Sequence, residues 1–314
     1  MTPIIREDRF RVMGCQSHLY LVGGSPGLVA QARERLEELE SRWSRFIPAS
    51  ELSQLNAAGG MPCVVSPDTF LLLERAVQGW NATGGAFDPT VLEAMVNAGY
   101  DRDFHEVAAD PSAGPVGPPA PGRGCASIRL DRRTRLVMLP EGIGIDPGGI
   151  GKGLAADLVV TEMLEAGAEG ICVSVGGDVR LAGRPPVPEG WLIGIEDPED
   201  DTKRLDEFCL ADGAVATSTT KLHAWQRDGR EQHHLIDPST GVPAVEPALL
   251  ATVVAGAGWW AEVLAKLALL AGCRGPELLA ERGASGLVIA ADGNRYETPD
   301  LGSLRRWTPR EVVC

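Results

Sequence analysis

The sequence predicts a mixed α+β domain whose helices and strands interleave irregularly, without the regular β-α-β alternation of a doubly wound sheet. Short apolar runs bounded by glycine, proline or aspartate mark strands along most of the chain, whereas residues 28–46 and 258–271 have helical apolar patterns. The 314 residues are 44% hydrophobic and 23% charged, as in ordinary globular domains, and they can bury one large core. We therefore expect residues 1–314 to form a single domain.

The N-terminal part of the chain should contain one strand followed by helices. Residues 11–22 alternate well enough for a strand, and glycines and a proline end it. Ser66 and Pro67 are residues favoured at the N-cap and first position of a helix. Asp88, Pro89 and Thr90 predict an extended corner, a common structural device, with Thr90 capping the next helix. The expected elements are a strand at 11–22, helices at 28–46 and 67–83, a helical turn at 50–56, and a helix running from Thr90 through Met95.

Residues 106–124 differ in composition from the rest of the chain, because prolines, glycines and alanines dominate them. Such a segment lacks the apolar surface needed to fold alone. We expect a flexible insertion that protrudes from the surface and does not separate two domains.

The remaining elements follow from short buried strands and one apolar helix. Residues 258–271 form the most apolar helical stretch of the chain, and Asp237 to Gly241 have the chemistry of a turn. The expected elements are a hairpin at 128–139, a short strand at 143–145, a helix from about Leu154, strands at 171–175, 191–195, 208–217, 233–236 and 249–255, the helix at 258–271, a strand at 287–290 and a hairpin at 292–294.

The glycine-rich stretch 142–157 is the first candidate binding element. Glycines let backbone N–H groups approach a ligand closely, and a helix N-terminus favours anions. Lys152 adds a positive charge there, and Asp146 adds a hydrogen-bond acceptor. This pattern indicates a diphosphate or nucleotide cradle, although it matches neither a Walker A loop nor a dinucleotide fingerprint. A purely structural turn is the alternative.

Several strand ends carry glycine, aspartate or hydroxyl residues, and we expect them to converge on one ligand crevice. These ends are 146–149, 176–178, 217–218 and 234–237. His234 lies at this edge and is the best candidate for a general base among the five histidines. A structural histidine is the competing interpretation.

Glu262 and Lys266 are unusual because they interrupt an otherwise apolar helix at positions i and i+4. A buried charge without a partner is costly, so the two should pair with each other or face a site. Both alternatives, a surface ion pair and the wall of a ligand pocket, are open.

Charge and cysteine content exclude several classes of protein. The net charge of -14 argues against a duplex nucleic-acid partner, so an anionic ligand would need a local positive site. Lysine occurs only at 152, 203, 221 and 266. Seven cysteines without a C-x-x-C pair indicate reduced thiols rather than disulfides or zinc ligands. We find neither an apolar run of membrane-spanning length nor an apolar signal region before Cys15, and expect a cytoplasmic protein without direct membrane insertion.

Taken together, these segments resemble the FAD:protein FMN transferase (ApbE) family, in the same order along nearly the whole chain. The resemblance implies a single ApbE-type (T-fold-like) mixed α/β domain with 106–124 as a surface insertion. The motifs that carry it are V-M-G at 12–14, S-E-L-S-Q-L-N at 50–56, G-G-A-F-D-P-T-V at 84–91, I-D-P-G-G-I-G-K-G-L-A-A-D at 145–157, S-V-G-G-D at 174–178, A-V-A-T-S at 214–218, H-L-I-D-P-S-T-G at 234–241 and the helix at 258–271.

Members of this family bind FAD and, with magnesium, transfer its FMN half to a threonine or serine of an acceptor flavoprotein, releasing AMP. By resemblance, His234 would deprotonate the acceptor hydroxyl, and Gly149 would offer a backbone carbonyl to the metal. The residues that the resemblance assigns to the FAD site are Met13, Phe46, Ala86, Phe87, Asp88, Asp146, Lys152, Asp178, Leu235 and Ala265.

The chain departs from the family pattern at its metal-binding helix. That helix usually reads A-D-x-L-A-T, with aspartate and threonine as magnesium ligands, whereas this chain reads A-E-V-L-A-K. Glu262 can still bind magnesium, but the ammonium of Lys266, which replaces the usual threonine, cannot be a ligand. Lys266 either supplies positive charge in place of the metal or pairs with Glu262 and abolishes the metal site.

Three functions are therefore compatible with the sequence. The first is FMN transfer to an acceptor protein, the second is FAD binding without transfer, and the third is hydrolysis of FAD to FMN and AMP. His234 and the turn at 237–241 favour the transferase, whereas the altered metal helix favours the second function.

Overall fold

The computed structural model describes residues 4–109, 115–245 and 248–305, and it confirms a mixed α+β fold. Its centre is an eight-stranded sheet in the order β1-β2-β6-β7-β10-β15-β16-β17, with all neighbours antiparallel. The strands are β1 (Ile5–Val12), β2 (Cys15–Val22), β6 (Gly170–Val175), β7 (Asp178–Gly183), β10 (Gly213–Thr219), β15 (Leu250–Ala255), β16 (Ser285–Ile289) and β17 (Arg295–Glu297).

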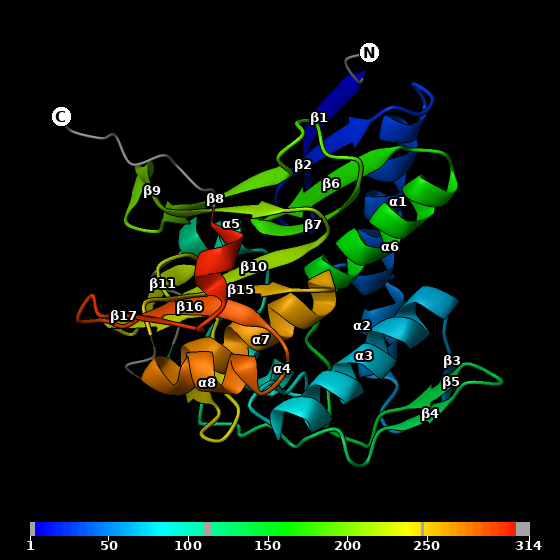
Figure 1. Cartoon of the computed structure of the whole chain (residues 1–314). Coiled ribbons are helices and arrows are strands. Elements are labelled where there is room, and N and C mark those ends of the chain that lie inside the picture. The colour runs from blue at the N-terminus through cyan, green and yellow to red at the C-terminus, as the bar shows by residue number, and fades with distance from the viewer. Residues whose placement is uncertain (1–3, 110–114, 246–247, 306–314) are drawn as a thin grey trace.

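Helices cover one face of this sheet. Figure 1 shows α6 and α7 side by side, in green and orange, with α1 next to α6. Leu154, Val159 and Met163 of α6 are buried against the sheet, as are Leu264 and Leu267 of α7. The helices of this layer are α1 (Leu28–Trp43), α6 (Gly151–Glu165), α7 (Gly258–Ala271) and α8 (Gly275–Ala280), with the short 3-10 helix η1 (Gly272–Arg274) before α8.

A two-stranded ribbon covers the opposite face of the sheet. It consists of β8 (Trp191–Asp197) and β9 (Asp200–Leu210), and the 3-10 helix η2 (Leu301–Leu304) lies beside it. Trp191 and Phe208 are buried in this second core. Val215 points into it, whereas Ala214 and Ala216 point to the helices. The central strands are therefore buried on both faces, which explains why they read as continuous apolar runs instead of alternating ones.

A third unit packs below the sheet and consists of two helices and a small sheet. These elements are α2 (Glu51–Ala57), α3 (Pro67–Thr83), β3 (Cys63–Val64), β4 (Arg129–Asp131) and β5 (Leu136–Met138). Ser66 caps α3 by accepting a hydrogen bond from the N–H of Thr69, as predicted, and Gly84 ends the helix in the left-handed conformation.

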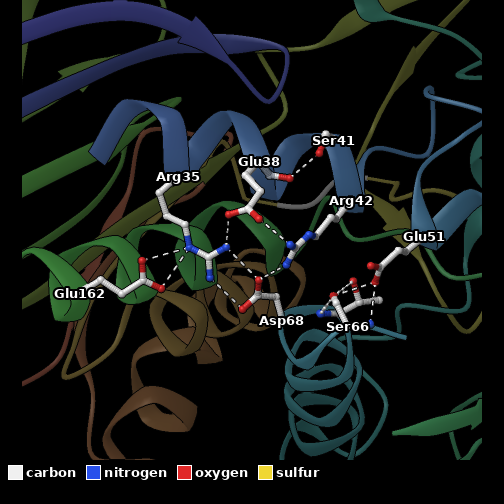
Figure 2. A network of polar contacts seen from close by, with 9 residues as sticks. Arg35, Glu38, Ser41, Arg42, Glu51, Ser66, Asp68 and Glu162 are labelled. Atoms are coloured by element: carbon white, nitrogen blue, oxygen red, sulfur yellow. Dashed lines mark hydrogen bonds and ion pairs between the residues drawn. The ribbon is translucent and has the colours of Figure 1, made fainter. Parts of the chain in front are cut away.

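An arginine–carboxylate network ties α3 to α1 and α6 (Figure 2). Arg35 pairs with Glu162 of α6 at 3.0 Å and with Asp68 of α3 at 2.8 Å. Arg42 also pairs with Asp68, and Glu38 pairs with both arginines. Each charged side chain of this outer network, defined by these five residues, therefore has at least one partner of opposite charge.

The N-termini of α6 and α7 are joined by reciprocal capping. Asp157 of α6 accepts hydrogen bonds from the N–H groups of Gly258 and Trp259 at 2.7 and 2.9 Å. Glu262 of α7 accepts one from the N–H of Gly153 at 2.9 Å. The two backbones touch at this point, because a Cβ added to Gly153 would lie 2.3 Å from the carbonyl oxygen of Gly258. Each helix thus supplies a carboxylate to the exposed amide groups of the other.

Smaller elements surround the open end of the sheet. Trp225 anchors them by donating a hydrogen bond from its indole N–H to the carbonyl of Ala98 at 3.0 Å. They are α4 (Leu92–Asn97), α5 (Phe104–Ala109), β11 (Ala224–Arg227), β12 (Arg230–His233), β13 (Ile236–Asp237) and β14 (Val242–Pro243).

Several predicted elements differ from the structure. The strand predicted at 11–22 is the end of one strand and the whole of the next, joined by a two-residue turn at Met13 and Gly14, both with positive φ. Gly14 is a usual residue of such a turn but Met13 is not, so the sequence signal for the turn was weak. The strand predicted at 208–217 is likewise the end of β9 and the start of β10. Residues 143–145 form no strand, and α6 begins at Gly151 rather than near Leu154.

Two further predictions on the segment 86–124 need correction. Thr90 does not cap α4, because its hydroxyl instead accepts hydrogen bonds from the N–H groups of Arg123 and Gly124. The described part of segment 106–124 does not protrude. Residues 106–109 belong to α5, and 115–124 run along the surface with backbone bonds such as Gly122 N–H to the Pro238 carbonyl at 2.8 Å. Residues 110–114 lie outside the described residues.

The strand predicted at 233–236 is interrupted, because His233 ends β12, Ile236 starts β13, and His234 and Leu235 between them belong to no strand. The other predicted elements have counterparts in the structure, and the helix at 258–271 agrees with its predicted bounds. Within the described residues, each helix is too short or too polar to span a bilayer. Six cysteines are described, and all six are free.

Candidate functional site

A cavity of about 980 Å³ opens where the N-terminus of α6 meets the ends of β2, β7 and β10. Its walls include the Met13 turn, the segment after α3, residues 146–149 and 151 of the glycine-rich turn, and residues 217–219, 221–224, 234–236 and 238. Three of the four predicted strand ends thus meet at this crevice, and of the fourth, 234–237, residues 234–236 reach it. Asp237 instead borders a smaller neighbouring cavity of about 380 Å³.

Two lysines and two carboxylates form a buried cluster at the α6 end of the cavity. Lys152 Nζ pairs with Asp178 Oδ2 and lies 3.4 Å from Glu262 Oε1. Lys266 Nζ lies 3.6 Å from the same Glu262 oxygen. Asp178 also accepts a hydrogen bond from the N–H of Thr217 at 3.3 Å. We call Lys152, Lys266, Asp178 and Glu262 the cavity cluster.

The two lysines of the cavity cluster differ in their electrostatic surroundings. Burial acts to lower the pKa of Lys152, but the Asp178 and Glu262 carboxylates outweigh burial and raise this pKa above its ordinary value. Burial lowers the pKa of Lys266, and Glu262 opposes this shift only in part because Lys152 adds a like charge. Lys152 is therefore a permanent cation, and Lys266 is the less firmly held of the two charges.

Lys266 fills the space beside the glycine-rich turn. A Cβ added to Gly149 would lie 2.9 Å from Cε of Lys266 and 2.8 Å from the Phe87 ring. The surface ion pair considered from the sequence is excluded, because the Glu262 side chain is only 1% exposed. The pair instead lies at the wall of the cavity, which Lys266 lines.

A magnesium ion at Gly149 and Glu262, as the resemblance implies, does not fit these residues. Glu262 Oε2 accepts the Gly153 N–H, and Glu262 Oε1 faces two ammonium groups. Ammonium groups cannot ligate a cation, and magnesium requires several oxygen ligands. Within the described residues, no three His, Cys, Asp or Glu side chains are grouped so that they could hold a metal ion.

Asp146 is held by an arginine that the sequence analysis did not single out. Arg45 Nε lies 2.7 Å from Asp146 Oδ2, and both side chains are less than a tenth exposed. The guanidinium also lies 4.2 Å from the ring centroid of Phe46 and 4.7 Å from that of Tyr100. The other Asp146 oxygen accepts the Gly148 N–H at 2.7 Å. Arg45 thus fixes the start of the glycine-rich turn and supplies a third positive charge at the cavity.

Both carboxylate oxygens of Asp88 accept hydrogen bonds from Thr90 or Gly124. Its Oδ1 accepts hydrogen bonds from the N–H and the hydroxyl of Thr90 at 2.9 and 2.7 Å. Its Oδ2 accepts the N–H of Gly124 at 3.0 Å. These bonds support the structural interpretation of the Asp-Pro-Thr corner, although Asp88 lines the cavity.

His234 lines the cavity as a neutral imidazole. Burial lowers its pKa well below the ordinary value, and the neighbouring His223 and the Lys266 ammonium lower it further. Its Nδ1 is buried without a hydrogen-bond partner among the described residues. The ring of His223 packs against it at 5.2 Å between centroids. A neutral imidazole with an unused nitrogen can accept a proton from a ligand in the cavity.

The structure brings most of the predicted site residues together. Ala265 is fully buried and Glu262 is 1% exposed, and neither contributes to the cavity wall, although Glu262 binds both lysines that do. The predicted residues that line the cavity are Met13, Phe46, Ala86, Phe87, Asp88, Asp146, Gly149, Lys152, Asp178, His234, Leu235 and Lys266.

Several cavity residues were missed from the sequence. His223 was not selected from the sequence, yet it packs on His234 and has a positive φ of 53°, an uncommon conformation for a residue other than glycine. Burial raises the pKa of Tyr100 to about 12, so its hydroxyl stays neutral beside Arg45. Cys15 also lines the cavity, and burial raises the pKa of its thiol.

Comparison with known proteins gives consistent relatives along most of the chain. The model of the ApbE family matches residues 13–288. The FAD:protein FMN transferase of Vibrio cholerae is 30% identical over 241 residues, covering 74% of this chain and 70% of that protein. The FAD:protein FMN transferase of Haemophilus influenzae is 25% identical over 323 residues, covering 95% of this chain and 90% of that protein.

Solved structures show the same fold. The ApbE protein of Thermotoga maritima is 25% identical and superposes with a TM-score of 0.82, covering 97% of this chain and 100% of that one. The flavin transferase ApbE of Vibrio cholerae superposes with a TM-score of 0.77 at 24% identity, covering 96% of this chain and 100% of that one.

Proposed function

This chain belongs to the ApbE family, and we propose that it is an FAD:protein FMN transferase that moves the FMN half of FAD to a threonine or serine hydroxyl of an acceptor flavoprotein. The products are a flavinylated acceptor, joined through a phosphoester bond, and AMP.

The observation that carries this function is the coincidence of three features in one cavity. The cavity lies at the upper end of the size range of ligand pockets, as an extended dinucleotide requires. Lys152, Lys266 and Arg45, each paired with a carboxylate, place cationic hydrogen-bond donors around the N-terminus of α6, where the helix end favours a diphosphate. His234 adds a neutral base to the same cavity.

The proposed reaction needs positioning, charge neutralisation and one proton acceptor. The acceptor hydroxyl oxygen forms a bond to the FMN phosphorus, and the bond from that phosphorus to the bridging oxygen of AMP breaks. AMP leaves with the electron pair of that bond. His234 takes the hydroxyl proton, and Lys152 with the amide groups of the glycine-rich turn stabilises the negative charge that develops on the diphosphate.

The cavity offers FAD both apolar and polar contacts in this proposal. Phe46, Phe87 and Tyr100 offer aromatic surface for the flavin ring, and Met13 adds a flexible apolar contact. Asp146 offers a carboxylate oxygen as a hydrogen-bond acceptor, which Arg45 keeps in place. Ala265 serves as packing behind the ligand wall, since its side chain is fully buried.

A transfer assay with an acceptor domain tests the function. The purified chain is incubated with FAD and a domain that carries a flavinylation threonine, and covalent flavin fluorescence is read in a denaturing gel while AMP is measured by chromatography. We expect a fluorescent band and an equal amount of AMP, both lost when the acceptor threonine is replaced by valine. FMN and AMP formed without acceptor would identify a hydrolase, and bound FAD without AMP would identify a flavin-binding protein.

We further propose a cytoplasmic location for the chain and its acceptor. The support is chemical, since the six described cysteines are free, as expected in a reducing compartment. Cell fractionation with an antibody against the chain would test this proposal, and recovery in an oxidising compartment would contradict it.

A further inference from the structure

We infer that Lys266 is a built-in cation at the phosphate end of the cavity, so that this enzyme binds FAD and transfers FMN without a divalent metal ion. The inference rests on the proposed function and states which group neutralises the diphosphate. It concerns the part of the chain that departs from its family, and four observations support it.

The first observation is that Glu262, at the family's metal-ligand position, already faces two cations, although its Oε1 has no hydrogen-bond partner among the described residues. Glu262 is 1% exposed, and its Oε2 accepts the Gly153 N–H at 2.9 Å. Its Oε1 lies 3.4 Å from Lys152 Nζ and 3.6 Å from Lys266 Nζ. A metal ion approaching Glu262 would therefore meet two ammonium groups, and repulsion between like charges at such distances is large in a buried site.

The second observation is that Lys266 occupies the space beside Gly149. Its Cε and Cδ would lie 2.9 and 3.1 Å from a Cβ at Gly149, so the side chain is in contact with the backbone of the glycine-rich turn. A metal ion bridging Gly149 and Glu262 would have to displace the lysine side chain from both residues.

The third observation concerns the hydrogen-bonding capacity of Lys266. In the described part of the chain, the hydrogen bonds and ion pairs of Lys266 Nζ go to Glu262 alone, through Oε1 and through the backbone carbonyl at 3.5 Å. An ammonium group has three donors, so Lys266 has donor capacity left for a ligand in the cavity that it lines.

The fourth observation is the charge balance of the cavity cluster. Two ammonium groups face two carboxylates, so the cluster carries no net charge and is stable before a ligand binds. When a diphosphate enters, Lys152 and Lys266 can turn donors toward it while Asp178 and Glu262 keep both ammonium groups in position. The site therefore neutralises the diphosphate with fixed side chains, a preorganised arrangement that needs no bound ion.

The first test measures FAD affinity by quenching of flavin fluorescence, in excess chelator and in excess magnesium. For the parent chain we expect the two dissociation constants to agree within about twofold. Lys266→Met, which removes the ammonium group but keeps an unbranched apolar stem, should weaken binding about tenfold or more in both conditions, as expected for a lost charge-assisted hydrogen bond. Lys266→Arg should retain binding in chelator.

Lys266→Thr restores the residue type usual in the family. FAD binding by this variant should therefore depend on a divalent metal ion instead of on the lysine. We expect weak FAD binding by this variant in chelator and recovery of about tenfold or more when magnesium is added. The matched control is Lys203→Thr, because Lys203 is an exposed lysine outside the cavity that pairs at the surface with Asp200 at 2.7 Å. This control should behave as the parent does.

A direct metal measurement completes the test. Electron paramagnetic resonance of added manganese should detect no bound ion in the parent chain, with or without FAD. Bound manganese in the parent, magnesium-dependent FAD binding by the parent, or Lys266→Met binding FAD as tightly as the parent would each overturn the inference. Thermal melting of each variant excludes loss of folding as the cause of weak binding.

The same data separate this inference from the proposed function. If FAD binds equally well in chelator and magnesium but no acceptor domain is flavinylated, the transferase proposal fails and the built-in cation stands. If flavinylation occurs only with magnesium, the transferase proposal stands and the built-in cation fails.

Discussion

The outer network and the cavity cluster are both groups of cations and carboxylates that involve α6, but they are built from different residues. The outer network uses arginine, and the single side chain of Arg35 contacts three carboxylates, those of Glu38, Asp68 and Glu162 (Figure 2). The cavity cluster uses lysine, and Lys152 and Lys266 share one oxygen of Glu262. The first links three helices at the surface, whereas the second faces a cavity of about 980 Å³.

The difference shows how a structural charge cluster can be told from a functional one. Arginine holds its five donors in a planar fork that matches carboxylates, and in the outer network these donors are directed at the protein itself. Lysine is a point charge with rotatable donors, and in the cavity cluster part of this capacity is directed at the cavity. We propose that a cluster that closes on itself, as the outer network does, serves the fold, whereas one that keeps donors toward a cavity serves ligand binding.

The largest effect that we expect on the cavity side comes from His234→Ala. This substitution should reduce the rate of FMN transfer by about 10²- to 10⁴-fold, the usual contribution of a general base. FAD affinity should stay within about twofold of the parent value, because the diphosphate contacts are unchanged. Single-turnover transfer kinetics and FAD fluorescence measure the two effects.

The control for this variant is His18→Ala, because His18 lies on β2 outside the cavity wall and pairs with Glu7 at 3.3 Å. If the rate of FMN transfer is the same in His234→Ala and in the parent, His234 is not the general base. Loss of FAD binding by His234→Ala would indicate a structural role instead.

The second effect compares one cation from each cluster. Lys152→Met should weaken FAD binding by about 10- to 100-fold, because it removes a charge-assisted contact to the diphosphate. Arg42→Met in the outer network should leave FAD affinity within about twofold. Isothermal titration of FAD into both variants makes the comparison, and equal losses of affinity would mean that the two clusters do not differ in function.

The third expected effect is a loss of stability, which should follow a substitution in the outer network that leaves FAD affinity unchanged. Asp68→Asn weakens the outer network, because Asp68 accepts from both Arg35 and Arg42 at a half-buried position, 14% exposed. We expect a loss of about 1–2 kcal/mol in the free energy of unfolding, between the values for surface and buried ion pairs. Urea denaturation measures it, and FAD affinity should not change. A changed affinity at an unchanged stability would contradict the separation of the two clusters.

The smallest effect is a pH dependence that His234 contributes. Its pKa is lower in the folded chain than in the unfolded chain, so the unfolded state binds more protons below about pH 6.5. The stability associated with neutral His234 is therefore complete above this pH and is lost as the pH falls toward the folded-state pKa, by at most about 1.4 kcal/mol per pH unit.

Urea denaturation of the parent and His234→Ala between pH 5 and 8 tests this dependence. The parent should lose more stability than the variant as the pH falls below about 6.5. Identical pH profiles would show that the imidazole of His234 titrates normally in the folded chain.

Much of the fold was predictable where the signal lies within a few residues. Ser66, Pro67 and Gly84 mark the ends of α3, and the apolar run 258–271 marks α7, because caps and periodicity are local properties. The turn at Met13 and Gly14 was missed because Met13 is an unfavourable residue for its left-handed backbone, which the pairing of β1 with β2 holds in place.

The candidate site was predictable only in part, because some of its features are local in the sequence and others are not. The glycine-rich turn, His234 and Lys266 stand out in the sequence because of their type and immediate context. The pairing of Arg45 with Asp146 and the contact of His223 with His234 depend on segments that meet only in the folded chain. Glu262 shows both cases. The i, i+4 spacing on one helix predicted its pairing with Lys266, but no local pattern predicted its pairing with Lys152, which comes from α6.

The backbone contact between Gly153 and Gly258 has a consequence for how this enzyme can diversify. A Cβ at either glycine would meet the backbone of the other helix, so side-chain size does not set the separation of α6 and α7 here. The separation of the α6 and α7 backbones beside Lys152 and Glu262 therefore depends on two residues that have no side chain to vary. Position 266 lies one turn further along α7, where a descendant can exchange its side chain while inheriting the rest of the cluster. If Lys266 replaces a metal ion, as we propose, the glycine contact provides a scaffold on which one substitution at position 266 exchanges a lysine for a metal site.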